Sequence, residues 1–437
     1  MSVFNWLGSN IFKQPPLFMG ILAMLGLILQ RKSIGDVVKG TAKTIMGVII
    51  LFVGVNFVTT AATPLATAFA TMYNLPESSI FDGNICWDVL GQYGSEIGLA
   101  LALSFIVNLI VAKFTPLKNI YLTGHIYFWT SYLAVAAGVQ GGLSGVGLVV
   151  FATVALSLYI IIVPALMRPL VRNVTGSDDF TIGHSTSIFC FLGAGIGKLF
   201  KNLHSKSTEE MKIPKGLDFF RDTTIASAIV ITLCYLVVGL VIGPEARQTV
   251  YGGAIDSICT VGGMQYDFIT FSLVAGLNFG AGLTILLTGV RLMLGEIIPA
   301  FKGISEKLIP NAIPALDVPM IFSFAPNALL IGFVGSMITS ILTIIVMANT
   351  GTMMYAVIPL TVACFFDCAP GAIFANKEGG RAAAIVTSIL SGIIMIILAM
   401  VSISLTLDTA AGFNQLYGGN DFSVFSSIAS LVAGLFG

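Results

Sequence analysis

Long apolar runs follow one another along almost the whole chain, and short polar segments separate them. Each run holds roughly 15 to 25 residues, the length that an α-helix needs to cross the hydrocarbon layer of a bilayer. A membrane β-barrel would instead show short segments in which apolar and polar residues alternate. The pattern predicts about eleven membrane spans, near residues 15–30, 44–66, 96–112, 119–138, 143–167, 217–243, 268–290, 327–348, 352–370, 382–406 and 422–437.

The composition agrees with this pattern. Of the 437 residues, 56% are hydrophobic and only 10% are charged, whereas a soluble domain carries about 25% charged residues. The 47 glycines suit membrane helices that pack closely or break. The formal net charge of zero says nothing about nucleic acid, but the chain shows no basic tail, and we expect no nucleic-acid partner. We therefore predict an all-α polytopic membrane protein in contact with membrane lipid.

Basic residues gather in alternate loops between the predicted spans. Nineteen of the 21 lysines and arginines lie in loops that share one face of the membrane in this topology, at 31–43, 113–118, 168–221, 291–307 and 377–381. Because cytoplasmic loops carry an excess of lysine and arginine, we predict that this face is cytoplasmic. The amino terminus is then outside the cell and the carboxyl terminus is inside.

The segment Arg291–Asn327 is too polar for a simple span and too apolar for an ordinary loop. Its first part predicts an amphipathic helix, with apolar positions every three to four residues at Leu294, Ile297, Ile298, Phe301, Ile304 and Leu308. Its second part holds one acid, Asp317, among the prolines Pro314, Pro319 and Pro326. A carboxylate at membrane depth is costly, and helices broken by proline are tolerated where they line a cavity. Asp317 is therefore a candidate functional residue.

This segment has an echo near the start of the chain. Residues Arg31–Val38 match Arg291–Ile298 at a constant offset of 260. Duplicated halves are typical of transporters, in which the binding site lies between the repeats near mid-membrane. We predict a single membrane domain over 1–437, with a first repeat at about 15–205, a second at about 215–406 and a last helix at about 422–437.

Two shorter stretches predict local features. The cytoplasmic insert at 168–216 contains an apolar, glycine-rich stretch, Ile188–Phe200, which predicts a re-entrant hairpin. The segment FANKEGGRAA, at 374–383, predicts a cytoplasmic turn at its glycine pair. Neither stretch is long or polar enough to form a separate soluble domain.

Two histidines lie in apolar surroundings, where a buried imidazole needs a partner. His125 is in LTGHIYF, where it either hydrogen-bonds a polar solute or packs against a backbone carbonyl. His184 is in TIGHSTS, where Gly183 permits a close backbone approach and the hydroxyls that follow suit a sugar-like ligand. The alternative for this stretch is a helix amino terminus capped by Thr181 or Ser185.

Several other chemistries are not predicted. The six cysteines show no CxxC spacing and the chain has no HxxxH pair, so we expect no metal site. The sequence has no P-loop motif of an ATPase and no convincing Ser-His-Asp order. We therefore expect no catalytic residue and no cofactor in this chain.

Several motifs together closely resemble those of the ascorbate-type EIIC permeases of the bacterial phosphoenolpyruvate-dependent sugar phosphotransferase system (PTS): LTGHIYF, TIGHS, RLMLGEIIPAFKGISEKLIPNAIPALD, FSFAPNA and FANKEGGRAA. The resemblance runs through nearly the whole chain. It implies a homodimer in the bacterial inner membrane, with a dimerising scaffold and a core of inverted repeats that moves like an elevator. It also implies a transporter subunit rather than an enzyme, whose substrate is phosphorylated by a separate EIIB protein that works with EIIA.

The resemblance places substrate contacts at the two histidines and Asp317, beside the segment FSFAPNA. The ascorbate-type pattern has a glutamine four residues after the first histidine and another directly after the second, where this chain has Trp129 and Ser185. Replacing two amides changes what the pocket can hydrogen-bond. We predict a site for a sugar or sugar-acid such as ascorbate, made of His125, Trp129, His184, Ser185, Asp317, Ser323 and Asn327.

An ion-coupled secondary transporter of a small polar solute is the alternative, with Asp317 as its coupling carboxylate. In that case Asp317→Asn would abolish pH-dependent uptake, whereas in a PTS permease it would mainly weaken substrate binding. A channel lacks support, because one acid and two histidines are more typical of an occluding site than of a pore ring.

Overall fold

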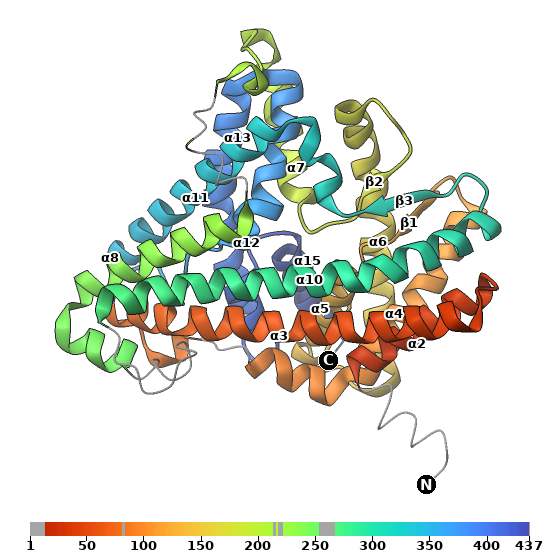
Figure 1. The fold of residues 1–437 in the computed structure, drawn as a ribbon, viewed down its shortest axis with the longest axis horizontal. Coiled ribbons are helices and arrows are strands. Elements are labelled where there is room, and N and C mark those ends of the chain that lie inside the picture. The colour runs from red at the N-terminus through yellow and green to blue at the C-terminus, as the bar shows by residue number, and fades with distance from the viewer. Residues whose placement is uncertain (1–13, 81–83, 213–215, 217–221, 253–266, 437) are drawn as a thin grey trace.

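The computed structural model describes residues 14–80, 84–212, 216, 222–252 and 267–436; within these ranges the side chains at 15, 18, 22, 77, 84–87, 294 and 297–308 are not described. Helices dominate this part of the chain (Figure 1). The α-helices are α2 (Pro15–Leu29), α3 (Ile34–Met72), α4 (Asn84–Phe114), α5 (Gly124–Gln140), α6 (Gly145–Thr175), α7 (Ser187–Phe200), α8 (Thr223–Gly252), α10 (Phe268–Leu308), α11 (Pro326–Asn349), α12 (Thr361–Ala363), α13 (Ala369–Leu405), α14 (Ala411–Tyr417) and α15 (Asp421–Ala433).

Several of these helices meet the length and hydropathy of a membrane span. Within the described residues there are seven such stretches: Ile34–Met72, Asp88–Phe114, Gly145–Thr175, Thr223–Gly252, Phe268–Met293, Pro326–Asn349 and Thr361–Leu405. The prediction of a mainly helical, polytopic membrane protein is therefore confirmed. The count of eleven spans stays a prediction, since α2, α5 and α15 are shorter than these seven.

The stretch Thr361–Leu405 is a helical hairpin rather than one straight span. Gly380 has a left-handed φ of 64°, which interrupts the helix at the glycine pair. The segments before and after Gly380 lie side by side. The sulfur atoms of Cys364 and Cys368 in the first segment are 3.9 and 3.6 Å from Met395 Sδ in the second. The chain reversal predicted at 374–383 is thus present, while the first arm begins at residue 361 and not near the predicted 352.

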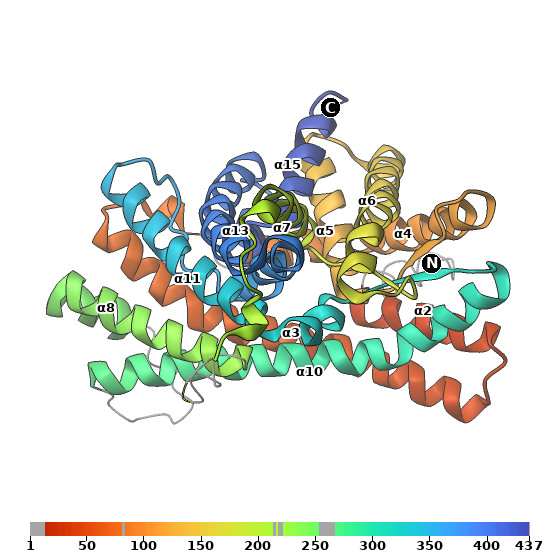
Figure 2. The ribbon, with the colours of Figure 1, turned by 90° about the horizontal axis from the view of Figure 1, so that it is seen from above.

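A long antiparallel helix pair, α3 and α10, runs along the molecule (Figures 1 and 2). Helices of about 40 residues are roughly 60 Å long, about twice the hydrocarbon thickness. The two backbones approach closely at glycines: a Cβ on Gly54 would lie 2.2 Å from Leu286 N, and one on Gly289 would lie 2.3 Å from Leu51 N. Small residues at such a crossing let membrane helices pack through their backbones.

The predicted echo falls partly on this pair, but the two copies have different local structures. Arg31 lies in the turn before α3 with a positive φ of 59°, whereas Arg291 lies inside α10. The predicted amphipathic segment is helical as the last part of α10, although the side chains at 294 and 297–308 lie outside the described ones. The repeat and its boundaries stay predictions.

A small parallel sheet that was not predicted lies among the helices. Its strands are β1 (Asn119–Tyr121), β3 (Ile313–Leu316) and β2 (Thr181–Ile182), with β3 in the centre. Tyr121 and Thr181 both pair with Ala315, so the three strands end at the same edge. The sheet joins three segments that are far apart in the sequence. Because the strands are parallel, all three segments leave the sheet in the same direction.

Candidate functional site

Three of the predicted site residues follow directly from the carboxyl ends of the three strands. His125 comes four residues after Tyr121 at the start of α5, His184 comes two residues after β2, and Asp317 directly follows β3. Ligands of parallel sheets commonly bind beyond the carboxyl ends of the strands. Gly183 makes the approach possible, because a Cβ there would lie 2.9 Å from the Tyr121 ring.

The two imidazoles face the same carboxylate. His184 Nε2 lies 3.5 Å from Asp317 Oδ1, and His125 Nε2 lies 3.9 Å from Asp317 Oδ2. The two histidine rings are 5.9 Å apart between centroids. Asp317 is also fixed from its own backbone side, since its Oδ1 accepts a hydrogen bond from Val318 N at 2.8 Å. The site thus combines one acceptor with two ring nitrogens, a set that can hold hydroxyl groups.

These residues line a cavity of about 770 Å³, a volume typical of small-molecule sites. Trp129 and Ser185 line it too, so five of the seven predicted residues meet in one place. The cavity is also lined by Thr284, Thr288 and Arg291 on α10 and by Asp222, directly before α8. A hydrogen bond from the Thr224 hydroxyl lowers the pKa of Asp222, so the lining near Arg291 and Asp222 carries both signs of charge.

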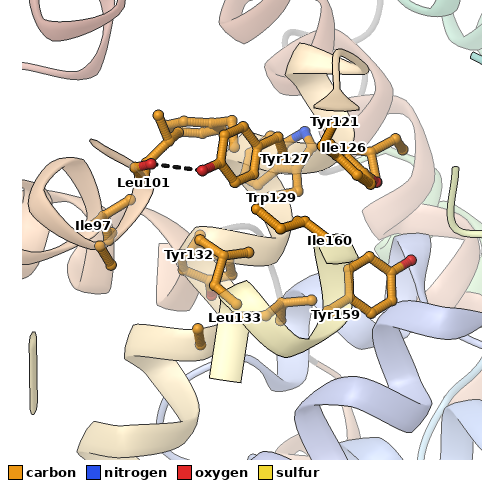
Figure 3. Close-up of a cluster of buried hydrophobic side chains, with 14 of the residues drawn as sticks. Ile97, Leu101, Tyr121, Ile126, Tyr127, Trp129, Tyr132, Leu133, Tyr159 and Ile160 are labelled. Atoms are coloured by element: carbon orange, nitrogen blue, oxygen red, sulfur yellow. Dashed lines mark hydrogen bonds between the residues drawn. The ribbon is translucent and has the colours of Figure 1, made fainter. Parts of the chain in front are cut away.

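Trp129 supplies the apolar wall. Its ring lies 5.1 Å from Phe413 and 5.9 Å from Tyr132, and only 8% of the residue is exposed. Behind it lies a buried cluster from α4, α5 and α6 (Figure 3). In this cluster the Tyr127 hydroxyl donates a hydrogen bond to Leu101 O at 2.6 Å, which ties α5 to α4. The Trp129 ring is therefore held by aromatic neighbours on several elements.

Ser323 and Asn327 are the two predicted residues that the structure places away from this cavity. Ser323 is exposed in the 3₁₀ segment η6 (Val318–Phe324). The Asn327 amide donates to the backbone oxygens of Thr208 and Met211, and its backbone N–H donates to the Glu209 carboxylate. An acid at a helix amino terminus satisfies its free N–H groups, and this occupies Asn327 at the start of α11.

The residues behind His184 were not predicted. Asp367 is 3% exposed and its Oδ1 lies 3.3 Å from His184 Nδ1, and Asn420 contacts the other carboxylate oxygen. The signal was present in the sequence, because Asp367 is an acid within an apolar run, as is Asp317. The first turn of α7 is satisfied by the Asp421 carboxylate rather than by the predicted caps Thr181 or Ser185.

The same cluster bears on metal binding. One ligand-type atom from each of His125, His184 and Asp317 lies within 4.8 Å of the other two. Such atoms could surround a cation or equally a hydroxylated solute. The expectations of no metal site and no cofactor remain predictions.

The chain is similar to a known protein family and to a curated protein. The family model described as "PTS system sugar-specific permease component" matches residues 10–421. A curated protein of Mycoplasma pneumoniae (strain ATCC 29342 / M129 / Subtype 1), named "Ascorbate-specific PTS system EIIC component", is 28% identical over 462 residues. That alignment covers 93% of this chain and 67% of the relative.

Proposed function

The chain belongs to the sugar-specific permease components (EIIC) of the phosphotransferase system, and we propose that its central cavity binds one sugar or sugar-acid molecule such as ascorbate. The observation that carries this proposal is the meeting of His125, His184 and Asp317 at one edge of the sheet, inside a cavity of about 770 Å³. Trp129 and Ser185 complete the proposed site.

The geometry suits a polyhydroxylated ring. A substrate hydroxyl can donate to Asp317 while it accepts from a histidine N–H, since an ionised carboxylate only accepts and an imidazole N–H donates. The Trp129 face offers an apolar surface to the carbon side of the ring. An acidic substrate brings a second negative charge near Asp317, and a protonated histidine offsets this repulsion.

Membership in the family makes the protein a transport component whose partners are EIIB and EIIA proteins. Phosphorylation of the substrate is then the work of a separate phospho-EIIB at the cytoplasmic side. The charge pattern supports an orientation with the amino terminus outside and the carboxyl terminus inside, in the bacterial inner membrane. The part of the cavity that Arg291 lines is then on the predicted cytoplasmic side.

The proposed movement is of the elevator type in a homodimer with eleven spans per protomer and two inverted repeats. The α3–α10 pair suits the role of a scaffold, because it is long and closely packed through glycines. The sheet, α5, α7 and the hairpin of α12 and α13 suit the role of the moving core. The five proposed substrate residues lie on α5 or just after strands β2 and β3, and α7 packs along α13.

The test uses vesicles that contain the purified full chain, with radiolabelled L-ascorbate and with neutral sugars as probes. We expect phosphorylated substrate to accumulate only when EIIA, EIIB and a phosphoryl donor are supplied on the cytoplasmic side. Uptake of free substrate driven by a proton gradient, without partner proteins, would contradict the proposed coupling and favour the ion-coupled alternative.

A further inference from the structure

His184 lies between two carboxylates. Its Nε2 is 3.5 Å from Asp317 Oδ1 on the cavity side, and its Nδ1 is 3.3 Å from Asp367 Oδ1 on the buried side. The centroids of the His125 and His184 rings are 5.9 Å apart. The Asp421 carboxylate accepts from Ser187 N, three residues after His184. The His184 ring itself is 5% exposed. Its rotation about χ2 would exchange nitrogen and carbon atoms at both carboxylates, so the two contacts together select one orientation.

Polar groups contact both carboxylate oxygens and the backbone oxygen of Asp367. The Ser185 hydroxyl donates to its Oδ1 at 2.7 Å, and the Asn420 amide donates to its Oδ2 at 2.7 Å. The Thr186 hydroxyl donates to its backbone oxygen at 2.6 Å. A carboxylate that is 3% exposed is costly unless its lone pairs are satisfied. The number of donors gathered here indicates a built arrangement rather than an incidental contact.

The backbone around Asp367 departs from a regular helix. The five residues Cys364–Cys368 form a π-helical turn, η7, between α12 and α13. Such turns insert one residue into a helix and are frequent at functional sites. At this position the turn presents Asp367 to the chain that follows β2.

The start of α15 fixes the same chain from the other side. Asn420 contacts Asp367, and its neighbour Asp421 donates its backbone N–H to Ser185 O at 3.1 Å. The Asp421 carboxylate accepts from Ser187 N and Ile188 N at 3.0 and 2.9 Å. The residues that directly follow His184, Ser185–Ile188, are therefore anchored to elements more than 180 positions later in the chain.

We propose that Asp367, held by Asn420, is a positioning residue that fixes the His184 imidazole with Nδ1 as a donor toward Asp367 and with Nε2 directed at Asp317 and the substrate. This rests on the proposed function, in which His184 contacts the substrate. When the imidazole is charged, Nε2 carries a proton as well as Nδ1. A fixed Nε2–H beside the Asp317 carboxylate then recognises a hydroxyl group that accepts from the histidine and donates to the acid.

The first test needs no substrate. The chain has only three histidines, so ¹⁵N-histidine labelling gives three imidazole spectra, and His184→Ala assigns one of them. In Asp367→Asn, one carboxylate oxygen becomes an NH₂ donor, which faces either the Asn420 amide donor or His184 Nδ1. Either orientation disturbs the contact with His184, so we expect the ¹⁵N shifts of His184 Nδ1 and Nε2 to change. Unchanged shifts would overturn the proposal.

The second test restores the contact. In Asp367→Asn/Asn420→Asp the acceptor and the donor are exchanged across the same hydrogen bond, so the amide oxygen at 367 again faces His184. Each single variant should lower the affinity for the probe L-ascorbate about tenfold, because Asp367→Asn removes the charge beside His184 and Asn420→Asp sets two carboxylates against each other. The double variant should recover the part of the affinity that depends on an acceptor facing His184. A double variant as weak as the singles would overturn the proposal.

Two further variants control for folding. Asn414→Asp also places a carboxylate in a buried part of the carboxyl-terminal region, where Asn414 bonds Thr406 and Ser426, and should leave the His184 shifts unchanged. Asn420→Ala removes the amide that donates to Asp367 and the oxygen that accepts from Phe422 N, and it replaces Asp367→Asn if that protein is unstable. Changed His184 shifts with unchanged ascorbate affinity would support the positioning role and contradict the proposed contact of His184 with substrate.

Discussion

The seam between α3 and α10 and the chain around His184 are both buried, but different kinds of interaction hold them together. In the helix pair, glycines let two backbones touch along an apolar seam, and Lys43 and Glu296 form an ion pair at 2.7 Å at one end. Around His184, carboxylates, hydroxyls and an amide satisfy one another at fixed geometry. Packing of the first kind is non-directional and gives stability, whereas polar contacts of the second kind are directional and give recognition.

The largest effect should come from Gly54→Ala in the helix pair. The added Cβ would lie 2.2 Å from the backbone nitrogen of Leu286, so the helices must separate. Overpacking of this kind costs about 3 kcal/mol, and we expect a much lower unfolding temperature in detergent. Gly295→Ala is the matched control on α10, since nothing lies within 4 Å of its Cβ. Similar stability of the two variants would refute the close approach.

Asp317→Asn should act on the other region, with a large loss of affinity and little loss of stability. The amide keeps one acceptor and loses the charge that faces both histidines. The loss of charge-assisted hydrogen bonds of about 1.5 to 3 kcal/mol lowers affinity roughly 10- to 100-fold. Titration with L-ascorbate measures this. Unchanged binding combined with the loss of pH-dependent uptake would instead identify Asp317 as an ion-coupling group.

His184→Ala and Cys190→Ala separate recognition from packing within a few residues of α7. His184 lines the cavity, so its loss should weaken substrate binding about tenfold. Cys190 is fully buried in an apolar cluster and should affect stability without changing affinity. Equal losses in a binding titration would undermine the assignment of the site.

The sequence predicted the helical region and the glycine pair well, because hydropathy and glycine are local signals. The reversal at Gly380 was visible as Gly379-Gly380 between apolar runs. The sheet was not visible, since strands of two to four residues from distant segments leave no alternation to detect. Only the structure explains why the two histidines and Asp317 meet.

The polar contacts around His184 were predicted only in part, because some of them leave a local signal in the sequence and others do not. Asp317 was found because an acid in an apolar segment is costly, and Asp367 satisfies the same criterion but was missed. The role of Asn420 depends on a contact over 53 positions, which no local pattern contains. Asn327 is the opposite case, a residue that was predicted in the site but bonds elsewhere. Its position beside Pro326 gives no sign that its backbone N–H donates to the Glu209 carboxylate.

Trp129→Gln should have a moderate effect on selectivity. Glutamine brings a donor and an acceptor in place of an apolar ring, as in the ascorbate-type pattern. We expect the ratio of L-ascorbate affinity to neutral-sugar affinity to rise about threefold, since a site built to hydrogen-bond one solute discriminates against others. Trp129 also packs against Phe52, which is not among the residues that line the cavity, so Phe52→Leu controls for loosened packing and should leave the ratio unchanged. An unaltered ratio in Trp129→Gln would remove this residue from the determinants of specificity.

The smallest effect should come from a polar contact at the surface. Arg168 donates two hydrogen bonds to Asp178, and these lower the pKa of that carboxyl. Because the folded-state pKa is below the unfolded one, the contact stabilises the fold above about pH 4 and is lost as the pH falls through the folded value. About a third of each side chain is exposed, so its contribution is below about 1 kcal/mol. Asp178→Asn should lower the unfolding temperature slightly at neutral pH and not at pH values where Asp178 is protonated. A loss as large as that of Gly54→Ala would mean that directional contacts stabilise this fold as strongly as its glycine seam.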